Sequence, residues 1–259
     1  MILSGLFKNN PEPEDRPGDG PLFYSYMLQY TQIDEIERVQ IMEHIKLVIF
    51  DMDGLLFDTE PVYYRAFKRS AEKLGYEVSF DTYLKCVGVT DETGKEIMAG
   101  IYGKNAQILQ VFDHYQEEFK KIIDEEGISV KPGVEELLDV LDQKEIKKCI
   151  ASSSARETIE KNVKVTGLEN RFDFYVSGLE VKNGKPAPDI FLEAARRGNV
   201  RPDEAIVFED SRHGLEAAVA ADIPCIIVPD LIEPDEEMRR KAFKIISDLS
   251  QAAELFRKS

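Results

Sequence analysis

The chain has 259 residues, of which 43% are hydrophobic and 9% aromatic, so it can form one large domain or a core domain with a smaller partner domain. Its 33 Lys and Arg residues against 49 Asp and Glu residues give a net charge of −16, which argues against binding to nucleic acid or to an anionic membrane surface. No apolar run approaches the roughly 20 residues of a membrane span. The three widely spaced cysteines, Cys86, Cys149 and Cys225, favour a reducing cytoplasm over a disulfide framework.

The N-terminal part of the chain differs from the rest. Residues 9–21 are rich in Pro, Gly and acidic residues and predict a disordered linker. Residues 22–42 contain enough apolar side chains to pack, with a weak helical pattern. We therefore assign residues 1–43 to a partly disordered extension with an unknown partner, and we expect residues 1–42 to be dispensable for catalysis. A natural start at Met42, just before the first predicted strand, is an alternative interpretation.

From Lys46 onward, short β-branched runs alternate with amphipathic stretches. The predicted strands are 46–50, 147–151, 172–177, 205–209 and 224–228, and the predicted helices between them are 134–141, 155–165, 189–197 and 214–221. This alternation predicts parallel βαβ units with right-handed crossovers, and hence an α/β fold with a doubly wound, Rossmann-like parallel sheet. We assign the core to residues 44–59 and 130–259.

Residues 60–129 interrupt the alternation, because they look helical throughout and contain no comparable strand. They predict an inserted helical cap that the chain enters just after the first strand. The candidates for substrate contact in the cap are Tyr63, Tyr64, Arg65, Lys68 and the Gly-flanked turn 88–94. Tyr64, Ala66 and Phe67 fit equally well as core positions of a cap helix, and Lys120 and Lys121 fit better on a solvated helix face.

Polar residues follow the predicted strands at the points where the strands end. They are Asp51 and Asp53 after the first strand, Ser152, Ser153 and Ser154 after the second, Lys185 beyond the third, and Glu209 and Asp210 at the end of the fourth. Ligands of open parallel sheets bind beyond the carboxyl ends of the strands. Acids, a hydroxyl and a lysine at one edge are the groups that a magnesium-assisted phosphoryl transfer uses.

Each of these groups also has a simpler interpretation. The serines could cap a helix, a Lys-Pro pair is typical of a solvated turn, and Glu209-Asp210 would suit the positive end of a helix that begins near Ser211. Their occurrence together, in order and at strand ends, favours the catalytic interpretation.

Four segments, VIFDMDGLLFDTE, IASSS, GKPAPDIF and IVFEDSRHGLEAA, resemble in this order the four motifs of the haloacid dehalogenase-like hydrolases. The resemblance covers roughly residues 45–257, and the most similar members in appearance are the β-phosphoglucomutase-like phosphatases with a helical cap. It implies a Mg²⁺-dependent phosphatase that hydrolyses a small phosphorylated metabolite, such as a sugar phosphate, through an aspartyl-phosphate.

The chemistry and the resemblance assign the same catalytic roles. Asp51 is expected to be the nucleophile, because a carboxylate can form an acyl phosphate and so divide one difficult displacement into two easier ones. Asp53 is expected to protonate the leaving alcohol and then to take a proton from the attacking water.

The remaining strand-end residues are expected to bind Mg²⁺ and phosphate. The expected metal ligands are Asp51, the backbone carbonyl of Asp53 and Asp210, with Glu209 as a further ligand or a partner of one. The expected phosphate-binding residues are Ser152, Ser153 and Lys185.

Three alternative functions have sequence features against them. The β-phosphoglucomutase pattern has a basic residue in the cap turn, where this chain has Asp91, and a histidine after the acidic loop, where this chain has Tyr63. Both departures favour a phosphatase and leave the phosphosugar mutase as the alternative. A haloacid dehalogenase needs neither Asp53 nor a metal, and a non-catalytic binding protein would not need the complete set of motifs.

Overall fold

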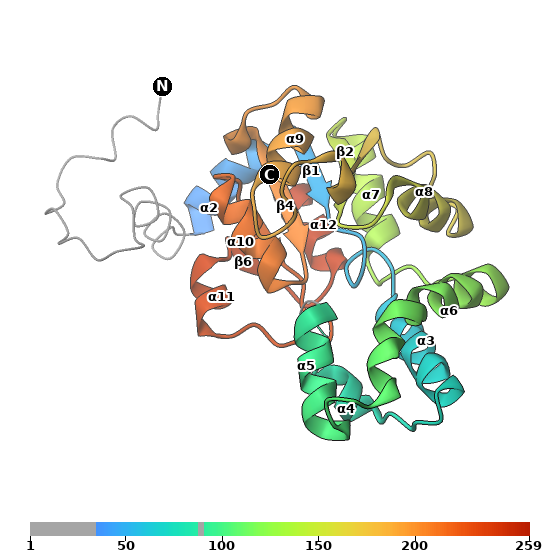
Figure 1. Cartoon of the computed structure of the whole chain (residues 1–259). Helices are drawn as coiled ribbons and strands as arrows, with labels where there is room; N and C mark the ends of the chain where they lie inside the picture. Colours follow the sequence, from blue (N-terminus) through green and yellow to red (C-terminus); the bar gives the residue numbers. More distant parts are fainter. Residues whose placement is uncertain (1–34, 88–90) are drawn as a thin grey trace, which may run out of the picture.

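The computed structural model describes residues 35–87 and 91–259 of the chain (Figure 1). The predicted linker at 9–21, most of the segment 22–42 and residues 88–90 of the Gly-flanked turn lie outside the described residues. Within the described ranges, no helix is long and apolar enough to cross a membrane.

The core is a six-stranded parallel sheet with the strand order β3-β2-β1-β4-β5-β6. The strands are β1 (Leu47–Phe50), β2 (Lys147–Ser152), β3 (Phe174–Ser177), β4 (Ala205–Glu209), β5 (Cys225–Ile227) and β6 (Lys244–Ile245). All four residues of β1 are buried, as expected for a central strand that has helices on both faces. The sequence did not predict β6, because two residues are too few to form a recognisable β-branched run.

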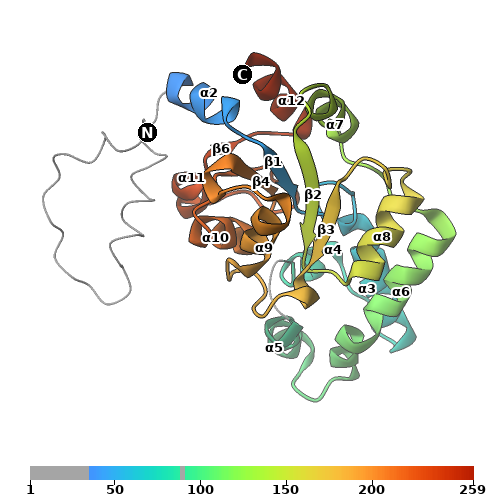
Figure 2. The ribbon, with the colours of Figure 1, turned by 90° about the horizontal axis from the view of Figure 1, so that it is seen from above.

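Helices cover both faces of the sheet (Figure 2). One face carries α7 (Val134–Gln143), α8 (Arg156–Val165) and α12 (Leu249–Lys258), and the other carries α9 (Asp189–Gly198) and α10 (Arg212–Ala220), followed by the short α11 (Glu236–Lys241). This arrangement confirms the predicted doubly wound α/β fold. Two single-turn 3₁₀ helices, η3 (Gly178–Glu180) and η4 (Pro202–Glu204), lie in the connections around α9.

A separate lobe of helices follows β1 (Figure 1). It consists of α3 (Glu60–Lys73), α4 (Phe80–Leu84), α5 (Asp91–Tyr102), the 3₁₀ helix η2 (Gln107–Gln110) and α6 (Val111–Glu126), and α3 packs along α6. Ala66 and Phe67, predicted as cap core positions, are buried there, and the Phe67 ring packs edge-on against the ring of Phe112. The predicted helical insertion is therefore present.

The two segments that join this lobe to the core lie side by side. Phe57 in the first segment and Val130 in the second form an isolated antiparallel bridge. The backbone N–H of Asp58 donates to the carbonyl of Ser129 at 2.9 Å. These contacts fix the entry and exit of the lobe next to the end of β1.

The helix α2 (Glu35–Glu43) precedes the sheet and packs against α12. Met42 is buried in the main hydrophobic core, and the guanidinium of Arg38 lies 5.1 Å from the centre of the Phe243 ring. The predicted extension 1–43 thus ends in a helix that belongs to the packing of the core.

Candidate active site

The register of the parallel strands brings the predicted residues to one edge of the sheet. Phe50 of β1 pairs with Ile150 of β2 and with Phe208 of β4. The residues that follow these three positions therefore lie at one level, and the backbone N–H of Asp51 donates to the carbonyl of Phe208 at 3.0 Å. Asp51 and Glu209 emerge side by side as a consequence.

Lys185 lies between these two carboxylates. Its Nζ donates to Oδ1 of Asp51 at 2.5 Å and to Oε1 of Glu209 at 2.6 Å, and it also contacts the carbonyl of Ala151 at 3.3 Å. The side chain is only 6% exposed. Burial acts to lower the pKa of Lys185, but the charges of Asp51 and Glu209 outweigh it and raise that pKa above its ordinary value. Lys185 is therefore a buried cation held by two acids.

The two carboxylates that flank Lys185 have different environments. Burial raises the pKa of Asp51 to about 7, with a further contribution from Glu209, while Lys185 opposes the shift. Oε2 of Glu209 accepts hydrogen bonds from the backbone N–H groups of Asp210 and Ser211 at 3.0 and 2.9 Å. Although burial acts in the opposite direction, Lys185 and the hydrogen bonds from Ser211 lower the pKa of Glu209. Glu209 is thus a fixed anion, and Asp51 is the acid that is open to a ligand.

Asp53 has one hydrogen-bonded and one unpaired carboxylate oxygen. Its Oδ2 accepts from the hydroxyl of Ser154 at 3.2 Å, and among the described residues its buried Oδ1 has no hydrogen-bond partner. Burial raises the pKa of Asp53, and the hydroxyls of Ser154 and Thr59 oppose that shift. The buried hydroxyl of Thr59 has no hydrogen-bond partner among the described residues. A protonatable carboxyl with an unpaired oxygen suits proton exchange with a bound ligand.

The three consecutive serines at the end of β2, of which Ser152 is the last residue of the strand, have three different environments. Ser152 is buried, and its Oγ accepts from the backbone N–H of Ser154 at 3.1 Å. Ser153 is exposed, and Ser154 reaches Asp53. None of the three caps α8, whose N-cap residue is Ala155. Ser154 was not among the predicted site residues, since the sequence does not show which of three adjacent serines turns toward β1.

The acids at this edge fit a divalent cation. Gly54 has a φ of +80°, and a Cβ at this position would lie 2.4 Å from Oδ2 of Asp210 and 3.2 Å from Oδ2 of Asp230. Burial raises the pKa of Asp210 well above its ordinary value, and the charges of Glu209 and Asp51 raise it further. A cation at this position would offset that repulsion and favour the ionised forms.

The donor set at this edge also fits Mg²⁺ in kind. In the described parts of the chain, no three His, Cys, Asp or Glu side chains gather around one metal position. The predicted ligands need only two carboxylates, Asp51 and Asp210, and the carbonyl of Asp53. Mg²⁺ commonly uses one or two carboxylates and keeps several waters, so such a sparse set is compatible with it.

Two further acids near the site were missed in the sequence. Asp230 follows β5, its Oδ1 accepts from Nζ of Lys131 at 2.6 Å, and its buried Oδ2 has no hydrogen-bond partner among the described residues. Glu60 begins α3 and accepts from the hydroxyl of Tyr83 at 3.0 Å, and burial raises the pKa of Glu60 to about 7. Inspection of the residues that follow the fifth predicted strand, as was done for the other strands, would have identified Asp230.

Two of the cap residues proposed for substrate contact, Tyr63 and Arg65, lie in different environments. The ring of Tyr63 stacks on Phe119 with centroids 4.0 Å apart, and burial followed by the charge of Asp53 raises the pKa of Tyr63. Tyr63 therefore lies near the site while forming part of the cap packing. Arg65 instead pairs with Glu126 at 2.5 Å on the exposed surface.

Comparison with known proteins identifies the family to which the chain belongs. Residues 48–228 match the family described as haloacid dehalogenase-like hydrolase. A phosphorylated carbohydrates phosphatase of Thermotoga maritima is 39% identical over 180 residues, which are 69% of this chain and 82% of that protein. A probable pseudouridine-5'-phosphatase of Drosophila melanogaster is 34% identical and is matched over 74% of this chain and 84% of its own length.

A solved structure of a putative β-phosphoglucomutase from Thermotoga maritima has the same fold, with a TM-score of 0.70 and 32% sequence identity. The similarity covers 83% of this chain and 99% of that one. The family match spans more than half of the chain, and the Thermotoga and Drosophila sequence relatives are both named as phosphatases. The chain is accordingly a phosphoric monoester hydrolase and belongs to the haloacid dehalogenase-like hydrolases.

Proposed function

We propose that this phosphatase hydrolyses a small phosphorylated carbohydrate in a Mg²⁺-dependent reaction that passes through an aspartyl-phosphate on Asp51. The observation that carries the proposal is the buried Lys185, which lies 2.5 Å from Asp51 and 2.6 Å from Glu209 at the edge where Asp53 also lies. The carbohydrate substrate class is supported by the name of the Thermotoga phosphatase, which is 39% identical to this chain.

In the first step, a carboxylate oxygen of Asp51 bonds to phosphorus as the bond from phosphorus to the alcohol oxygen breaks. The electron pair of the broken bond goes to the leaving oxygen, which takes a proton from the Asp53 carboxyl. In the second step, Asp53 takes a proton from a water whose oxygen bonds to phosphorus, and the carboxylate of Asp51 is released. Lys185 offsets negative charge in both steps.

The phosphate oxygens need hydrogen-bond donors around Asp51. Ser152 is buried at the end of β2, and because its oxygen already accepts from Ser154 N, its hydroxyl hydrogen can be donated to phosphate. We assign phosphate binding to Ser152, Ser153 and Lys185. When bound, Mg²⁺ would be held by Asp51, the Asp53 carbonyl and Asp210, with Glu209 beside them, and it would supply positive charge to the phosphate.

The cap would select the rest of the substrate. Residues 60–129 are proposed to form it, since α3 to α6 follow directly on the end of β1 that carries Asp51 and Asp53. The second candidate function is a phosphosugar mutase, favoured by the similarity to the putative β-phosphoglucomutase. Asp91 places a negative charge in the first turn of α5, and Tyr63 packs on Phe119, so neither residue supplies a cation for a second phosphate.

Phosphate release from a panel of phosphorylated metabolites with Mg²⁺ tests the proposal. We expect turnover of one or more sugar phosphates, loss of that turnover on chelation, and no turnover by a folded Asp51→Asn variant. More than a few per cent of wild-type activity in that variant would contradict the assignment of the nucleophile. A coupled assay in which β-glucose 1-phosphate, primed with the bisphosphate, isomerises much faster than phosphate is released would favour the mutase.

A further inference from the structure

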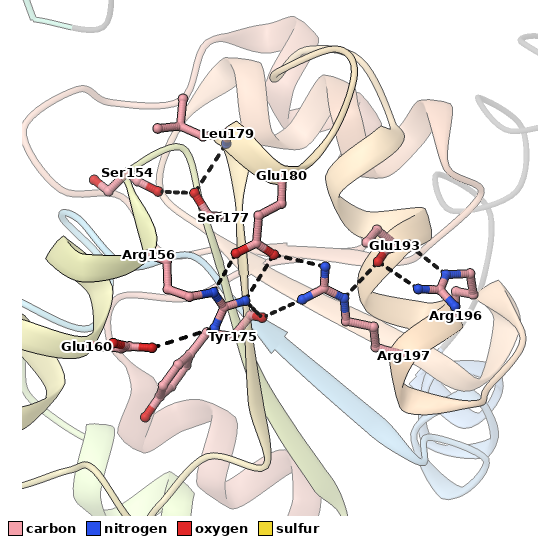
Figure 3. A network of polar contacts seen from close by, with 10 residues as sticks. All are labelled: Ser154, Arg156, Glu160, Tyr175, Ser177, Leu179, Glu180, Glu193, Arg196 and Arg197. Carbon is pink, nitrogen blue, oxygen red and sulfur yellow. Dashed lines mark hydrogen bonds and ion pairs between the residues drawn. The ribbon is translucent and has the colours of Figure 1, made fainter.

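The loop that carries the active-site serines rests on the end of β3. Ser177, the last residue of β3, is buried and pairs in register with Ser152. Its hydroxyl donates to the backbone carbonyl of Ser154 at 2.7 Å (Figure 3). Next to it, Gly178 lies so close to the loop that a Cβ there would be 3.0 Å from Cα of Ser153. The end of β3 therefore fixes the backbone of the loop from outside the site.

The hydroxyl of Ser177 is itself held by the helix that follows. It accepts from the backbone N–H of Leu179 at 3.2 Å and so caps η3. Glu180 in η3 is paired with two arginines. Arg156 Nε lies 2.5 Å from Oε1 and its Nη2 lies 2.9 Å from Oε2, while Arg197 Nη2 lies 2.9 Å from Oε2 (Figure 3).

The same two arginines also form hydrogen bonds with the edge strand of the sheet. Both donate to the backbone carbonyl of Tyr175 in the edge strand β3, Arg156 at 2.9 Å and Arg197 at 3.0 Å. An edge strand otherwise presents unpaired carbonyls to solvent. Because Arg156 begins α8 directly after the serine loop and Arg197 comes from α9, two helices hold the segment on which the loop rests.

We propose that Ser177 is a positioning residue for the general acid Asp53. By fixing the carbonyl of Ser154, it places the Ser154 hydroxyl 3.2 Å from Oδ2 of Asp53. The other oxygen of Asp53 has no hydrogen-bond partner in the described ranges, so Ser154 is the side chain that orients this carboxyl. The inference rests on the proposed function, in which Asp53 protonates the leaving oxygen.

Loss of this positioning should slow the hydrolysis of some phosphate esters more than others, depending on their leaving group. A misoriented Asp53 weakens proton transfer to the leaving oxygen, whereas Asp51 remains in place to form the new bond to phosphorus and Lys185 remains in place to offset negative charge. A sugar phosphate has a poor leaving group that needs this proton. A p-nitrophenyl phosphate has a leaving group that departs readily as the anion and hardly needs it.

The test compares kcat/KM for both esters in wild type, Ser154→Ala, Ser177→Ala and the double variant. kcat/KM reports the steps up to release of the alcohol, so the second step does not obscure it. We expect Ser177→Ala to lower kcat/KM for the sugar phosphate by about 10-fold or more, which is a part of the roughly 10²–10⁴-fold that general acid catalysis contributes. The kcat/KM for the aryl ester should change by less than about twofold. The double variant should be no worse than Ser154→Ala, because both changes remove the same contact with Asp53.

Arg197 and its neighbour Arg196 in α9 provide a test variant and a matched control. Arg197→Ala removes contacts to Glu180 and to the Tyr175 carbonyl, and we expect the same selective loss in a weaker form. The neighbouring Arg196 donates to Glu193 and is 72% exposed, so Arg196→Ala should leave both rates unchanged. If Ser177→Ala does not fold, the contrast between these two variants decides.

Equal losses on the two esters, or no loss on either in folded Ser177→Ala, would overturn the positioning role. A wild-type protein that hydrolyses neither ester would instead overturn the proposed function. The two failures are distinguished by the activity of the unmodified enzyme.

Discussion

Nζ of Lys185 lies 2.5 Å from Oδ1 of Asp51, although 134 positions separate the two residues in the chain. Asp51 follows the central strand β1, and Lys185 lies in the connection between β3 and α9. Glu209, at the end of β4, completes the contact from the other side. A cation buried between two acids has a clear use where a phosphate dianion must approach a carboxylate nucleophile.

Lys185→Ala is expected to lower kcat/KM by at least about 100-fold, the usual effect of removing one fixed donor to a charged transition state. The melting temperature should change little in comparison, because Asp51 can take up a proton and become neutral once its cationic partner is gone. Lys182→Ala is the matched control, since Lys182 is an exposed lysine of the same connection. Unchanged kinetics in Lys185→Ala would make Lys185 a turn residue without a catalytic role.

Gly54→Ala is expected to weaken Mg²⁺ binding strongly. A Cβ at this position would lie 2.4 Å from Oδ2 of Asp210, and the positive φ of +80° adds backbone strain. Gly75→Ala controls for the strain, because Gly75 has a φ of +81° and a Cβ there would meet nothing within 4 Å. Calorimetric titration with Mg²⁺ should show at least a 10-fold larger Kd for the first variant only. Equal affinities in the two variants would place the metal elsewhere.

Mg²⁺ itself is expected to raise the melting temperature of the wild-type protein. A ligand that binds only the folded state at 100 times its Kd adds about 2.7 kcal/mol to the free energy of unfolding. Asp210→Asn should abolish this shift, and its metal-free melting temperature should be equal to or above that of the metal-free wild type, since the charges of Glu209 and Asp51 repel Asp210. A full Mg²⁺-induced shift in the variant would exclude Asp210 as a ligand.

A chain that begins at Met42 is expected to keep its turnover but to lose stability relative to one that begins at Glu35. The shorter chain lacks most of α2, including Arg38, which lies over the Phe243 ring, and it frees the end of the chain at the buried Met42. Burial of a Met side chain contributes about 1.5–3 kcal/mol, so urea unfolding should show a decrease of that order. Inactivity of the shorter chain at a temperature where it is folded would contradict its dispensability for catalysis.

The sequence by itself determined the fold class and the residues at the strand ends. Runs of three or four apolar residues that alternate with helical stretches predict buried parallel strands, and the carboxyl ends of such strands meet at one edge of the sheet. Asp51 and Glu209 meet for this reason, because β1 and β4 are neighbours in the sheet. Lys185 reaches them from the connection between β3 and α9, so its position also depends on that loop.

Only the tertiary structure decided what happens within the loops and between the elements. Ser152, Ser153 and Ser154 have the same side-chain chemistry, but Ser152 is buried as the last residue of β2. The turn that follows exposes Ser153 and directs Ser154 to Asp53. Ser177 supports that turn from a different strand. Loops lack the regular side-chain periodicity of helices and strands. The direction of each loop side chain therefore depends on contacts with residues that lie far away in the sequence.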